Sequence, residues 1–263
     1  MNIGIVQSSP IFGEIDRNLA DCLAQMTPHK ADLWVLPELF ATGYQFLNAG
    51  EAHALAEPVP NGQTTQALIE HAREFDCFIV AGLPELDDKS VFNASILVGP
   101  DGLVARYRKI HLFYEEKMNF APGDLPFAVV DIGIAKVGMM ICFDHLFPES
   151  ARSLALQGAD IICHPANLVL PDLAQRTMSI RALENGVFTA TANRVGSEER
   201  GNESLTYTGQ SQIIDPKGEP RVRLSLDHAE VAVVEIDVAQ SRSKSITKHN
   251  DKLSDRRPEL YAL

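Results

Sequence analysis

The chain has 263 residues, of which 45% are hydrophobic and 22% are charged, and its formal net charge is −12. This composition is typical of a folded globular protein and excludes a collagen, a coiled coil or a disordered chain. An acidic surface repels phosphate backbones and anionic lipids, so we expect neither nucleic acid nor a membrane as a partner. No linker or low-complexity stretch divides the sequence, and its length suits one α/β unit, so we predict a single domain over residues 1–263.

The cysteines indicate a reducing environment. There are four, widely spaced and without a C-x-x-C pair, namely Cys22, Cys77, Cys142 and Cys163. The first residues lead straight into a strand-like segment without a basic region or a long apolar stretch. No run reaches the ~18 apolar residues that a membrane span needs. We therefore predict a cytoplasmic protein with free thiols.

The first third of the chain alternates between strand and helix patterns. Residues 2–7 predict a buried strand, and apolar residues spaced at i, i+3, i+4 and i+7 predict a helix over residues 19–26. A short apolar run, 33–36, is stopped by Pro37, which cannot continue a central strand. A second helix is expected up to Phe75, followed by a strand over residues 77–82.

Hairpin signals then interrupt this alternation. Residues 91–98 and 103–109 are extended runs joined by the turn Gly99-Pro100-Asp101-Gly102. Residues 127–131 and 135–142 predict another strand pair, and Pro148 and Gly158 bound a helix. After a strand at 161–164, Asp172 and Gln175 resemble a capping box that starts a helix ending near Gly186. The remaining strands are predicted at 187–193, 209–214 and 231–236.

The hairpins favour an α/β (α+β) fold with two mixed sheets packed face to face and helices outside. A purely parallel doubly wound sheet would not need them. In addition, residues 31–37 resemble residues 159–165, since each segment follows a helix and ends a strand with Pro. This repeat predicts two similar halves, each of which ends a strand at one shared site.

Three reactive side chains stand at the ends of predicted strands. Glu38 follows Pro37 between large apolar residues, Lys109 ends one strand, and Cys142 ends another. Strand ends are where α/β folds place reactive groups on a rigid support. Taken singly, each has an ordinary explanation as a turn residue, a solvated edge residue or a small buried core residue. The histidines His111, His145 and His164 match no zinc spacing, so no metal is expected.

Read together, these segments resemble the nitrilase superfamily of carbon–nitrogen hydrolases, and the resemblance covers nearly the whole chain. The matching motifs, in order, are Pro37-Glu38-Leu39-Phe40 with Thr42-Gly43-Tyr44, Tyr107-Arg108-Lys109 with His111-Leu112-Phe113, Cys142-Phe143-Asp144 with Phe147-Pro148-Glu149, Gly158-Ala159-Asp160, His164-Pro165-Ala166-Asn167, Arg181-Ala182-Leu183-Glu184-Asn185 and Asn193-Arg194-Val195-Gly196. The resemblance implies a four-layer α-β-β-α sandwich, a homodimer or larger assembly, and no cofactor.

The resemblance also implies a role for each reactive residue. Glu38 matches the general base, Lys109 the stabiliser of the negative oxygen, Cys142 the nucleophile and Glu116 a second glutamate. The backbone N–H of Phe143 matches a further donor to that oxygen. A thiol with an ordinary pKa near 8.5 needs an adjacent base or cation to become a ready thiolate. The expected reaction passes through a thioester on the cysteine, with ammonia as the leaving group.

The substrate is expected to be a small aliphatic amide. The sequence Cys142-Phe143-Asp144 is closer to the amidase branches of the family, but it is also similar to small archaeal nitrilase-type enzymes, so a nitrile is the alternative. An N-carbamoyl amine hydrolase is disfavoured because His145 and Leu146 stand where that branch usually carries arginines. An inactive binding or scaffold protein is disfavoured by the intact triad. The predicted substrate-binding residues are Phe40, Tyr44, Tyr114, Phe143, His145 and Asn167.

The C-terminal segment, residues 241–263, is basic in an acidic protein. It contains six basic residues against three acidic ones. Such a tail suits an acidic face of its own fold or of a second subunit, and a solvated tail is the alternative. We predict that it lies at a subunit interface.

Overall fold

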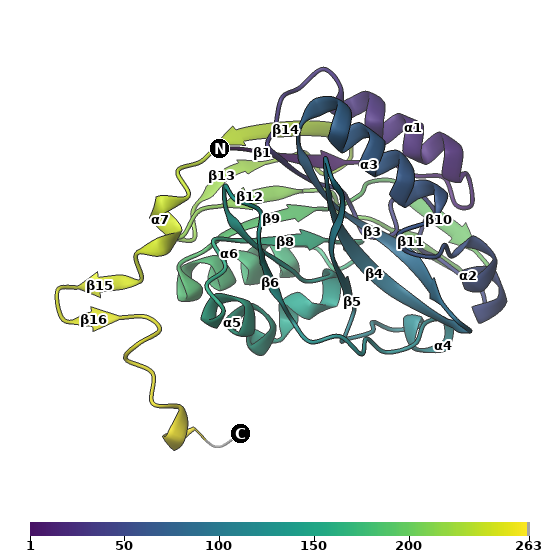
Figure 1. The fold of residues 1–263 in the computed structure, drawn as a ribbon. Helices are drawn as coiled ribbons and strands as arrows, with labels where there is room; N and C mark the ends of the chain where they lie inside the picture. The colour runs from purple at the N-terminus through teal and green to yellow at the C-terminus, as the bar shows by residue number, and fades with distance from the viewer. Residues whose placement is uncertain (262–263) are drawn as a thin grey trace.

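The computed structural model describes residues 1–261. Two six-stranded sheets pack face to face, with helices on the outer face of each (Figure 1). Helices α1 (Ile15–Met26) and α3 (Gln63–Phe75) cover the first sheet, and α5 (Pro148–Leu156) and α6 (Leu173–Asn185) cover the second. The layers are therefore α, β, β and α, which confirms the predicted sandwich.

Each sheet has three adjacent parallel strands at its centre. The first sheet follows the order β14 (Glu230–Glu235), β1 (Asn2–Gln7), β2 (Leu33–Val35), β3 (Phe78–Asp87), β4 (Ser90–Gly99) and β5 (Gly102–Arg108). The second follows the order β6 (Val129–Asp131), β7 (Lys136–Met139), β8 (Ile161–Pro165), β9 (Phe188–Ala192), β12 (Gln212–Ile214) and β13 (Pro220–Arg223). The parallel strands are β1 to β3 in one sheet and β7 to β9 in the other.

The two sheets share one topology, which confirms the predicted pair of similar halves. Each trio of parallel strands has one antiparallel strand on one side and an antiparallel hairpin on the other. Asp32 and Asp160, which occupy equivalent places in the sequence repeat, also make equivalent contacts. Asp32 accepts the backbone N–H of Asn2 at 2.6 Å, and Asp160 accepts that of Lys136 at 3.0 Å. Each carboxylate thus holds the start of the first parallel strand in its half.

Burial on both faces explains the continuous apolar runs of the central strands. Alternate residues of β2 point to opposite sides, so Leu33 and Val35 join the core between the sheets while Trp34 packs under α1 and α3. Gly4 on β1 is required here, because a Cβ atom would lie 2.3 Å from the Trp34 ring. A separate cluster that includes Leu154 and Met178 packs α5 and α6 against the second sheet.

The structure corrects the predicted secondary structure at Cys142. Residues 135–142 were expected to form one strand, but β7 ends at Met139 and Cys142 opens a short 3-10 helix, Cys142–Leu146. The backbone of Cys142 has φ +42°, a left-handed conformation that no strand contains. An apolar run does not reveal such a turn, because its side chains are buried in either conformation.

Several other elements differ from the prediction. The capping box is wrong, since Asp172 precedes α6 with φ +60° and its side chain makes no capping bond. The sequence pattern also missed short elements, namely α2 (Ala49–Leu55), α4 (Glu116–Asn119), β13 and the hairpin of β10 (Ser197–Arg200) with β11 (Glu203–Thr206). Each has seven residues or fewer, and all except α2 are mostly polar, so periodicity gives little signal.

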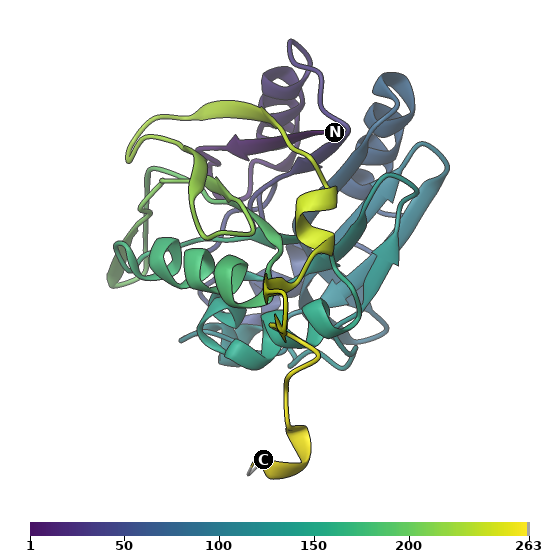
Figure 2. The same ribbon diagram turned by 90° about the vertical axis from the view of Figure 1, so that its left-hand side faces the viewer.

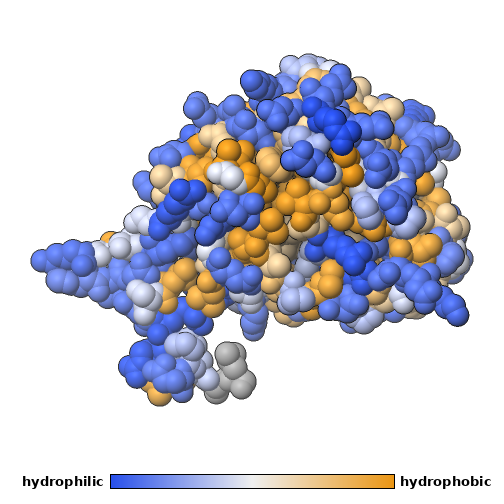
Figure 3. Space-filling model, viewed as in Figure 1, coloured by the Kyte–Doolittle hydropathy of each residue, from blue (hydrophilic) through white to orange (hydrophobic). Residues whose placement is uncertain are grey.

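The C-terminal segment leaves the body of the molecule. After α7 (Ala239–Arg242), the hairpin of β15 (Ser245–Thr247) with β16 (Asn250–Asp251) and a 3-10 turn, Pro258–Leu260, extend away from the sandwich in both views (Figures 1 and 2). Apolar side chains gather in the middle of the face seen in Figure 1, while the extended segment is mostly polar (Figure 3). Within residues 1–261, no helix has the length and apolar character needed to cross a membrane.

Candidate active site

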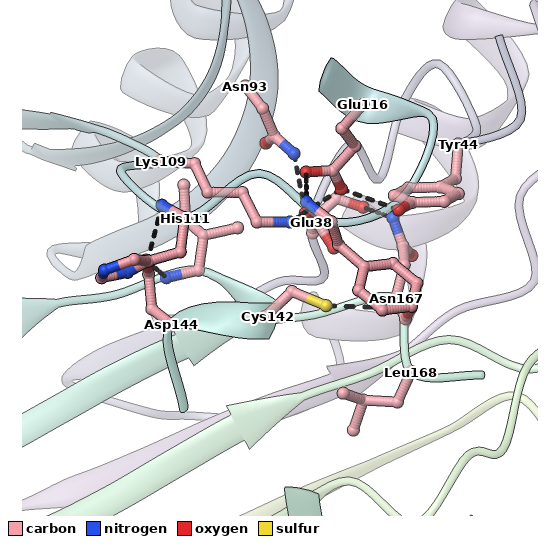
Figure 4. A network of polar contacts seen from close by, with 12 residues as sticks. Glu38, Tyr44, Asn93, Lys109, His111, Glu116, Cys142, Asp144, Asn167 and Leu168 are labelled. Carbon is pink, nitrogen blue, oxygen red and sulfur yellow. Dashed lines mark hydrogen bonds and ion pairs between the residues drawn. The ribbon is translucent and has the colours of Figure 1, made fainter. Parts of the chain in front are cut away.

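The loops that follow strands of both sheets bring the predicted reactive residues together. Glu38 follows β2, Lys109 directly follows β5, Cys142 follows β7 and Asn167 follows β8. Figure 4 shows the side chains of Glu38, Lys109 and Glu116 gathered in one cluster, with the thiol of Cys142 extending toward it. The shared site predicted from the sequence repeat is thus present, with each half contributing residues to it.

Lys109 lies between two carboxylates. Its Nζ donates to Oε1 of Glu38 and to Oε1 of Glu116, each at 2.7 Å. Lys109 is only 1% exposed, and both glutamates are buried. Burial acts to lower the pKa of Lys109, but Glu116 and Glu38 outweigh it and hold the pKa above its ordinary value. The ammonium ion therefore stays charged in this buried position.

Glu38 keeps one oxygen free. Its Oε1 accepts Lys109 and also Nδ2 of Asn93 at 2.7 Å, whereas its buried Oε2 has no hydrogen-bond partner among the described residues. The backbone of Glu38 is fixed as well, because its carbonyl accepts Nδ2 of Asn167 at 2.8 Å. Burial raises the pKa of Glu38 to about 7, although Lys109 opposes this shift. A carboxyl group with this pKa exchanges a proton readily near neutral pH.

Glu116 is held by three donors. Besides Lys109, the hydroxyl of Tyr44 donates to Oε1 at 2.7 Å, and the backbone N–H of Phe113 donates to Oε2 at 3.0 Å. Burial, followed by the charge of Glu116, raises the pKa of Tyr44 well above its ordinary value, so the hydroxyl keeps its proton. Glu116 accordingly has a fixed orientation beside Lys109.

The backbone around Cys142 is clamped from both sides. Its carbonyl accepts Nε2–H of His164 at 2.9 Å, and the other ring nitrogen lies 3.1 Å from Oγ1 of Thr191. Asp144 is fully buried and accepts the backbone N–H of Ile141 at 2.9 Å. These contacts hold a left-handed backbone that costs a non-glycine residue about 1–3 kcal/mol.

Asp144 also ties this turn to the segment that carries Lys109. The same Oδ2 that accepts Ile141 accepts the hydroxyl of Tyr107 at 2.8 Å, and Oδ1 lies 2.7 Å from Nδ1 of His111. Tyr107 and His111 flank Lys109 by two residues on either side. One buried carboxylate therefore fixes the thiol and the ammonium ion relative to each other.

The surroundings of Cys142 disfavour a thiolate in the resting site. Burial raises the pKa of the Cys142 thiol well above its ordinary value, Glu38 raises it further, and Lys109 lowers it by less. Two carboxylates face one ammonium ion, so a thiolate would add a second uncompensated negative charge. Cys142 is therefore protonated in the resting site, and its thiol would need a base to become a thiolate.

A narrow pocket opens beside the thiol. The predicted residues Phe143, His145 and Asn167 line it together with Cys142, and its volume is about 30 Å³. The rest of its wall is apolar, and is formed by Phe113, Leu168, Val169, Leu170, Leu173 and Ala174. Burial, with help from Arg181, lowers the pKa of His145 to about 4, so this wall is uncharged near neutral pH.

The other predicted binding residues lie elsewhere. Tyr44 and Tyr114 line an adjoining pocket of about 20 Å³, which shares Phe113 and Val169 with the first and is also lined by Glu116. Tyr114 is 56% exposed, and its hydroxyl donates to Oε1 of Glu203 at 2.7 Å. Phe40 is fully buried in the core under α1 and α3 and lines neither of these two pockets. Its side chain points away from the site because Glu38 and Phe40 are separated by the left-handed residue Leu39.

The sequence analysis missed several residues of the site. Asn93 lies within the predicted strand β4 and nothing in the local pattern marks it. His164 and Asp144 lie inside the motifs, where a polar residue at an apolar strand end is the available signal. Within residues 1–261, no cluster of three or more His, Cys, Asp or Glu side chains is arranged to hold a metal ion.

Comparison with known proteins defines the class. The sequence model of the carbon-nitrogen hydrolase family matches residues 3–244. The chain is 49% identical over 264 residues to a nitrilase of Pyrococcus abyssi, with 99% of both chains covered. It is 34% identical over 262 residues to an (R)-stereoselective amidase of a Pseudomonas species, with 98% of this chain and 92% of the relative covered.

A solved structure agrees in fold. A glutamate-to-glutamine mutant of an amidase from Nesterenkonia sp. AN1, which shows the result of Michael addition of acrylamide at the active-site cysteine, matches with a TM-score of 0.81 and 27% identity. The match covers 99% of this chain and 98% of that one. The chain therefore belongs to the carbon-nitrogen hydrolase family, within the nitrilase superfamily. It is a carbon–nitrogen hydrolase by family, and its relatives include proteins named amidases and proteins named nitrilases.

Proposed function

We propose that this protein hydrolyses small aliphatic amides to a carboxylic acid and ammonia through a thioester on Cys142. The observation that carries the proposal is the buried Lys109, held at 2.7 Å from both Glu38 and Glu116 beside the thiol. Such a site combines a nucleophile, a base with a pKa of about 7 and a fixed positive charge.

In the first step the sulfur of Cys142 attacks the amide carbon while Glu38 takes the thiol proton. The acceptor is Oε2 of Glu38, which has no hydrogen-bond partner among residues 1–261. The carbonyl oxygen becomes negative and is stabilised by Lys109 and by the backbone N–H of Phe143. Phe143 is the second residue of its 3-10 helix, so no carbonyl of a preceding turn accepts this N–H. One such donor typically contributes about 3–4 kcal/mol to transition-state stabilisation.

In the second step the tetrahedral intermediate collapses. Glu38 returns its proton to the amide nitrogen, the carbon–nitrogen bond breaks, and ammonia leaves a thioester on Cys142. Water then attacks the thioester carbon as Glu38 accepts a proton from it. The carbon–sulfur bond breaks, the sulfur recovers the proton, and the acid is released. Glu116 keeps Lys109 in place throughout and lowers the cost of burying its charge.

The apolar pocket beside Cys142 supports a small acyl group without a charge. Its wall carries no ionised side chain near neutral pH, and a charged acyl chain would be buried there without a partner. This argues for an aliphatic amide over an acyl chain that ends in a carboxylate. A binding or scaffold role is disfavoured because nothing in such a role requires a lysine buried between two carboxylates.

A nitrile is the second candidate, and the similarity to the nitrilase of Pyrococcus abyssi favours it. Attack of Cys142 on a nitrile carbon would give a thioimidate, which takes up one water and loses ammonia to reach the same thioester. The same residues serve both reactions, so the substrate decides between them. An N-carbamoyl amine remains the weaker candidate, because no arginine lines the pocket among the described residues.

An ammonia-release assay on matched pairs of amides and nitriles tests the proposal. Each pair shares its acyl group, for example propionamide with propionitrile. We expect higher kcat/KM for the amide in each pair. Equal or faster turnover of the nitriles would show that the protein is a nitrilase instead.

We further propose that the protein works in the cytoplasm as a homodimer. Its four cysteines are all buried and unpaired, which suits a reducing compartment. The extended C-terminal segment and the apolar side chains gathered on one face support the homodimer, as discussed below.

A further inference from the structure

One hairpin breaks the equivalence of the two halves. In the first half only residues 88–89 join β3 to β4, whereas in the second half residues 193–211 join β9 to β12 and include the hairpin β10–β11. The inserted hairpin reaches the loop after β2 in the opposite half, because Glu198 on β10 contacts the backbone of Tyr44 and Gln45. An element without a counterpart in the repeat is a candidate for a specific task at the site.

Glu198 is only 5% exposed, and donors surround its carboxylate. It accepts the backbone N–H of Gln45 at 2.7 Å, and both of its oxygens lie 3.2 Å from the backbone nitrogen of Tyr44. The hydroxyl of Tyr207 adds a further bond at 3.1 Å, and Arg194 forms an ion pair with it. A loop held in this way has little freedom to move.

The charge of Glu198 is compensated by a side chain that is itself fixed. The guanidinium of Arg194 is buried, lies 3.9 Å from the centre of the Tyr207 ring, and donates to the carbonyl of Pro10 at 3.0 Å. A buried ion pair contributes little net stability once desolvation is counted. Its geometry is therefore the more informative property, and here that geometry fixes the backbone of Tyr44.

Gly43 makes the close approach possible. Its φ is +82°, and a Cβ atom at this position would lie 2.8 Å from Oε1 of Glu198 and 2.9 Å from Cα of Phe12. Any other residue would push the carboxylate away from the N–H groups of Tyr44 and Gln45. This explains the Thr42-Gly43-Tyr44 motif in terms of packing against Glu198.

Tyr44 links this cluster to the reactive residues. Its hydroxyl donates at 2.7 Å to Oε1 of Glu116, the same oxygen that accepts Nζ of Lys109 at 2.7 Å. Its ring packs edge-on against Tyr207, with 6.3 Å between ring centres. A displacement of the Tyr44 backbone would therefore be transmitted to Glu116 and from there to Lys109.

We propose that Glu198 is a positioning residue for the hydrolysis described above, and that it acts through Tyr44 to hold Glu116 against Lys109. This inference rests on the proposed function, since it assigns Glu198 to the same site. Loss of the Glu198 charge would release the Tyr44 loop and misplace the ammonium ion that stabilises the negative oxygen. The chemical step would slow more than substrate binding would weaken.

A double-mutant cycle tests the link. We expect Glu198→Gln to lower kcat roughly 10–100-fold with KM nearly unchanged, because small misplacements of catalytic groups cost rates of this order. Tyr44→Phe removes the hydroxyl that bonds Glu116 and should also lower kcat. If Glu198 acts through Tyr44, the double variant should stay within about twofold of Tyr44→Phe alone.

The control and a second route keep the test decisive. Glu51→Gln removes a carboxylate that pairs with Arg200 on the same hairpin but does not contact Tyr44, and it should retain wild-type kcat. If Glu198→Gln does not fold, Tyr207→Phe can take its place, because it removes one donor to Glu198. It should lower kcat by a smaller factor, and it should cause no further decrease when combined with Tyr44→Phe. Additive losses, or an unchanged kcat for Glu198→Gln, would overturn the inference.

Failure of the proposed function has a different signature. If the wild-type protein turned over neither amides nor nitriles, the proposed reaction would be wrong. The double-mutant cycle would then be measured by the rate at which iodoacetamide alkylates Cys142. That rate depends on the arrangement of Glu38 and Lys109 around the sulfur. It should fall in Glu198→Gln and should show no further fall when the substitution is added to Tyr44→Phe; additive falls would contradict the link.

Discussion

At the scale of single residues, Cys142 lies among groups that disfavour its own anion. Burial and Glu38 raise the pKa of the thiol, so deprotonation and attack have to occur together. Glu38 suits this role because its own pKa, about 7, is much closer to that of a thiol than an ordinary carboxyl group's is. The proton transfer is thereby less uphill than it would be to an exposed glutamate.

Removal of the thiol should abolish the reaction without unfolding the protein. We expect Cys142→Ala to lower ammonia release by roughly 10⁴-fold or more, as loss of a nucleophile does in other hydrolases. Cys163→Ala is the matched control, since Cys163 is a buried thiol on the neighbouring strand β8. It should keep its activity, and melting curves should show that both variants fold. Turnover by Cys142→Ala near the wild-type rate would place the nucleophile elsewhere.

The pH dependence of hydrolysis should report Glu38. The base must be ionised to accept a proton, so kcat/KM should rise with pH and reach half its plateau near pH 7, the pKa to which burial raises this carboxyl.

The raised pKa of Glu38 also means that the folded protein binds more protons than the unfolded chain between pH 4.5, the ordinary pKa of this group, and about 7. The contribution of Glu38 to stability therefore falls as pH rises through that window.

The hydrogen bond from Asn93 to Glu38 offers a way to shift the acid limb of the kcat/KM pH profile. Its amide donates to the ionised form of Glu38 and lowers the pKa, so Asn93→Ala should shift the acid limb of kcat/KM upward by about one unit. Asn185→Ala removes a buried amide on α6 whose one hydrogen bond within residues 1–261 goes to the carbonyl of Arg181, and its profile should match the wild type. If the acid limb of the pH profile is unchanged in Asn93→Ala, it reports the ionisation of a group other than Glu38.

At the scale of elements, the turn after β7 decides where the thiol of Cys142 points. The structure gives Cys142 a φ of +42°, and Asp144 bonds the backbone just before it. The same carboxylate reaches Tyr107 and His111 on either side of Lys109. The turn and the end of β5 are thus one unit, although 33 residues separate Lys109 from Cys142 in the chain.

Asp144→Asn tests this unit. An amide has one acceptor oxygen where the carboxylate has two, so its NH₂ group would face an existing donor. We expect the free energy of unfolding to fall by about 1–3 kcal/mol and kcat to drop with it. Denaturant unfolding and steady-state kinetics measure the two effects. Asp172→Asn is the control, because the side chain of Asp172 makes no capping bond and Asn tolerates φ +60°. Equal stability of the two variants would contradict the role of Asp144.

At the scale of the whole molecule, the C-terminal segment lacks a core of its own. It is attached through Arg242, which pairs with Asp160, and through Lys244 and Lys252, which donate to carbonyls at the end of α6. Beyond these contacts it carries exposed apolar residues, namely Ile246, Leu260 and Tyr261. Leu156 on α5 and Ile180 and Leu183 on α6 are also exposed. Apolar side chains left open on a segment and on nearby helices indicate a protein contact.

The proposed homodimer rests on these surfaces. We expect the full chain to sediment as a dimer at micromolar concentration and a variant that ends at residue 244 to sediment as a monomer. The shortened chain keeps Arg242 and its bond to Asp160, so its fold should persist. Analytical ultracentrifugation gives the masses, and circular dichroism checks the fold. A monomeric full chain would show that the segment is a solvated tail.

The sequence by itself predicted the layers, the repeat and the candidate reactive residues. The spacing of apolar residues in a segment reflects which of its faces is buried. This pattern can be read from the segment itself, without knowledge of the rest of the fold. Glu38, Lys109 and Cys142 each place a reactive group after an apolar run, but their roles were predicted from the resemblance of the ordered motifs to a known family. The polar elements, such as α4 and the hairpin β10–β11, left no such pattern and were not predicted.

Only the tertiary structure decided how these residues act on one another. Phe40 and Tyr44 looked alike as binding residues, yet the backbone turn at Leu39 and Gly43 sends the first into the core and the second to Glu116. The raised pKa of Cys142 comes from burial and from charges far away in the chain. Electric fields and hydrogen bonds depend on distance in space, and a linear pattern of residue types does not contain that distance.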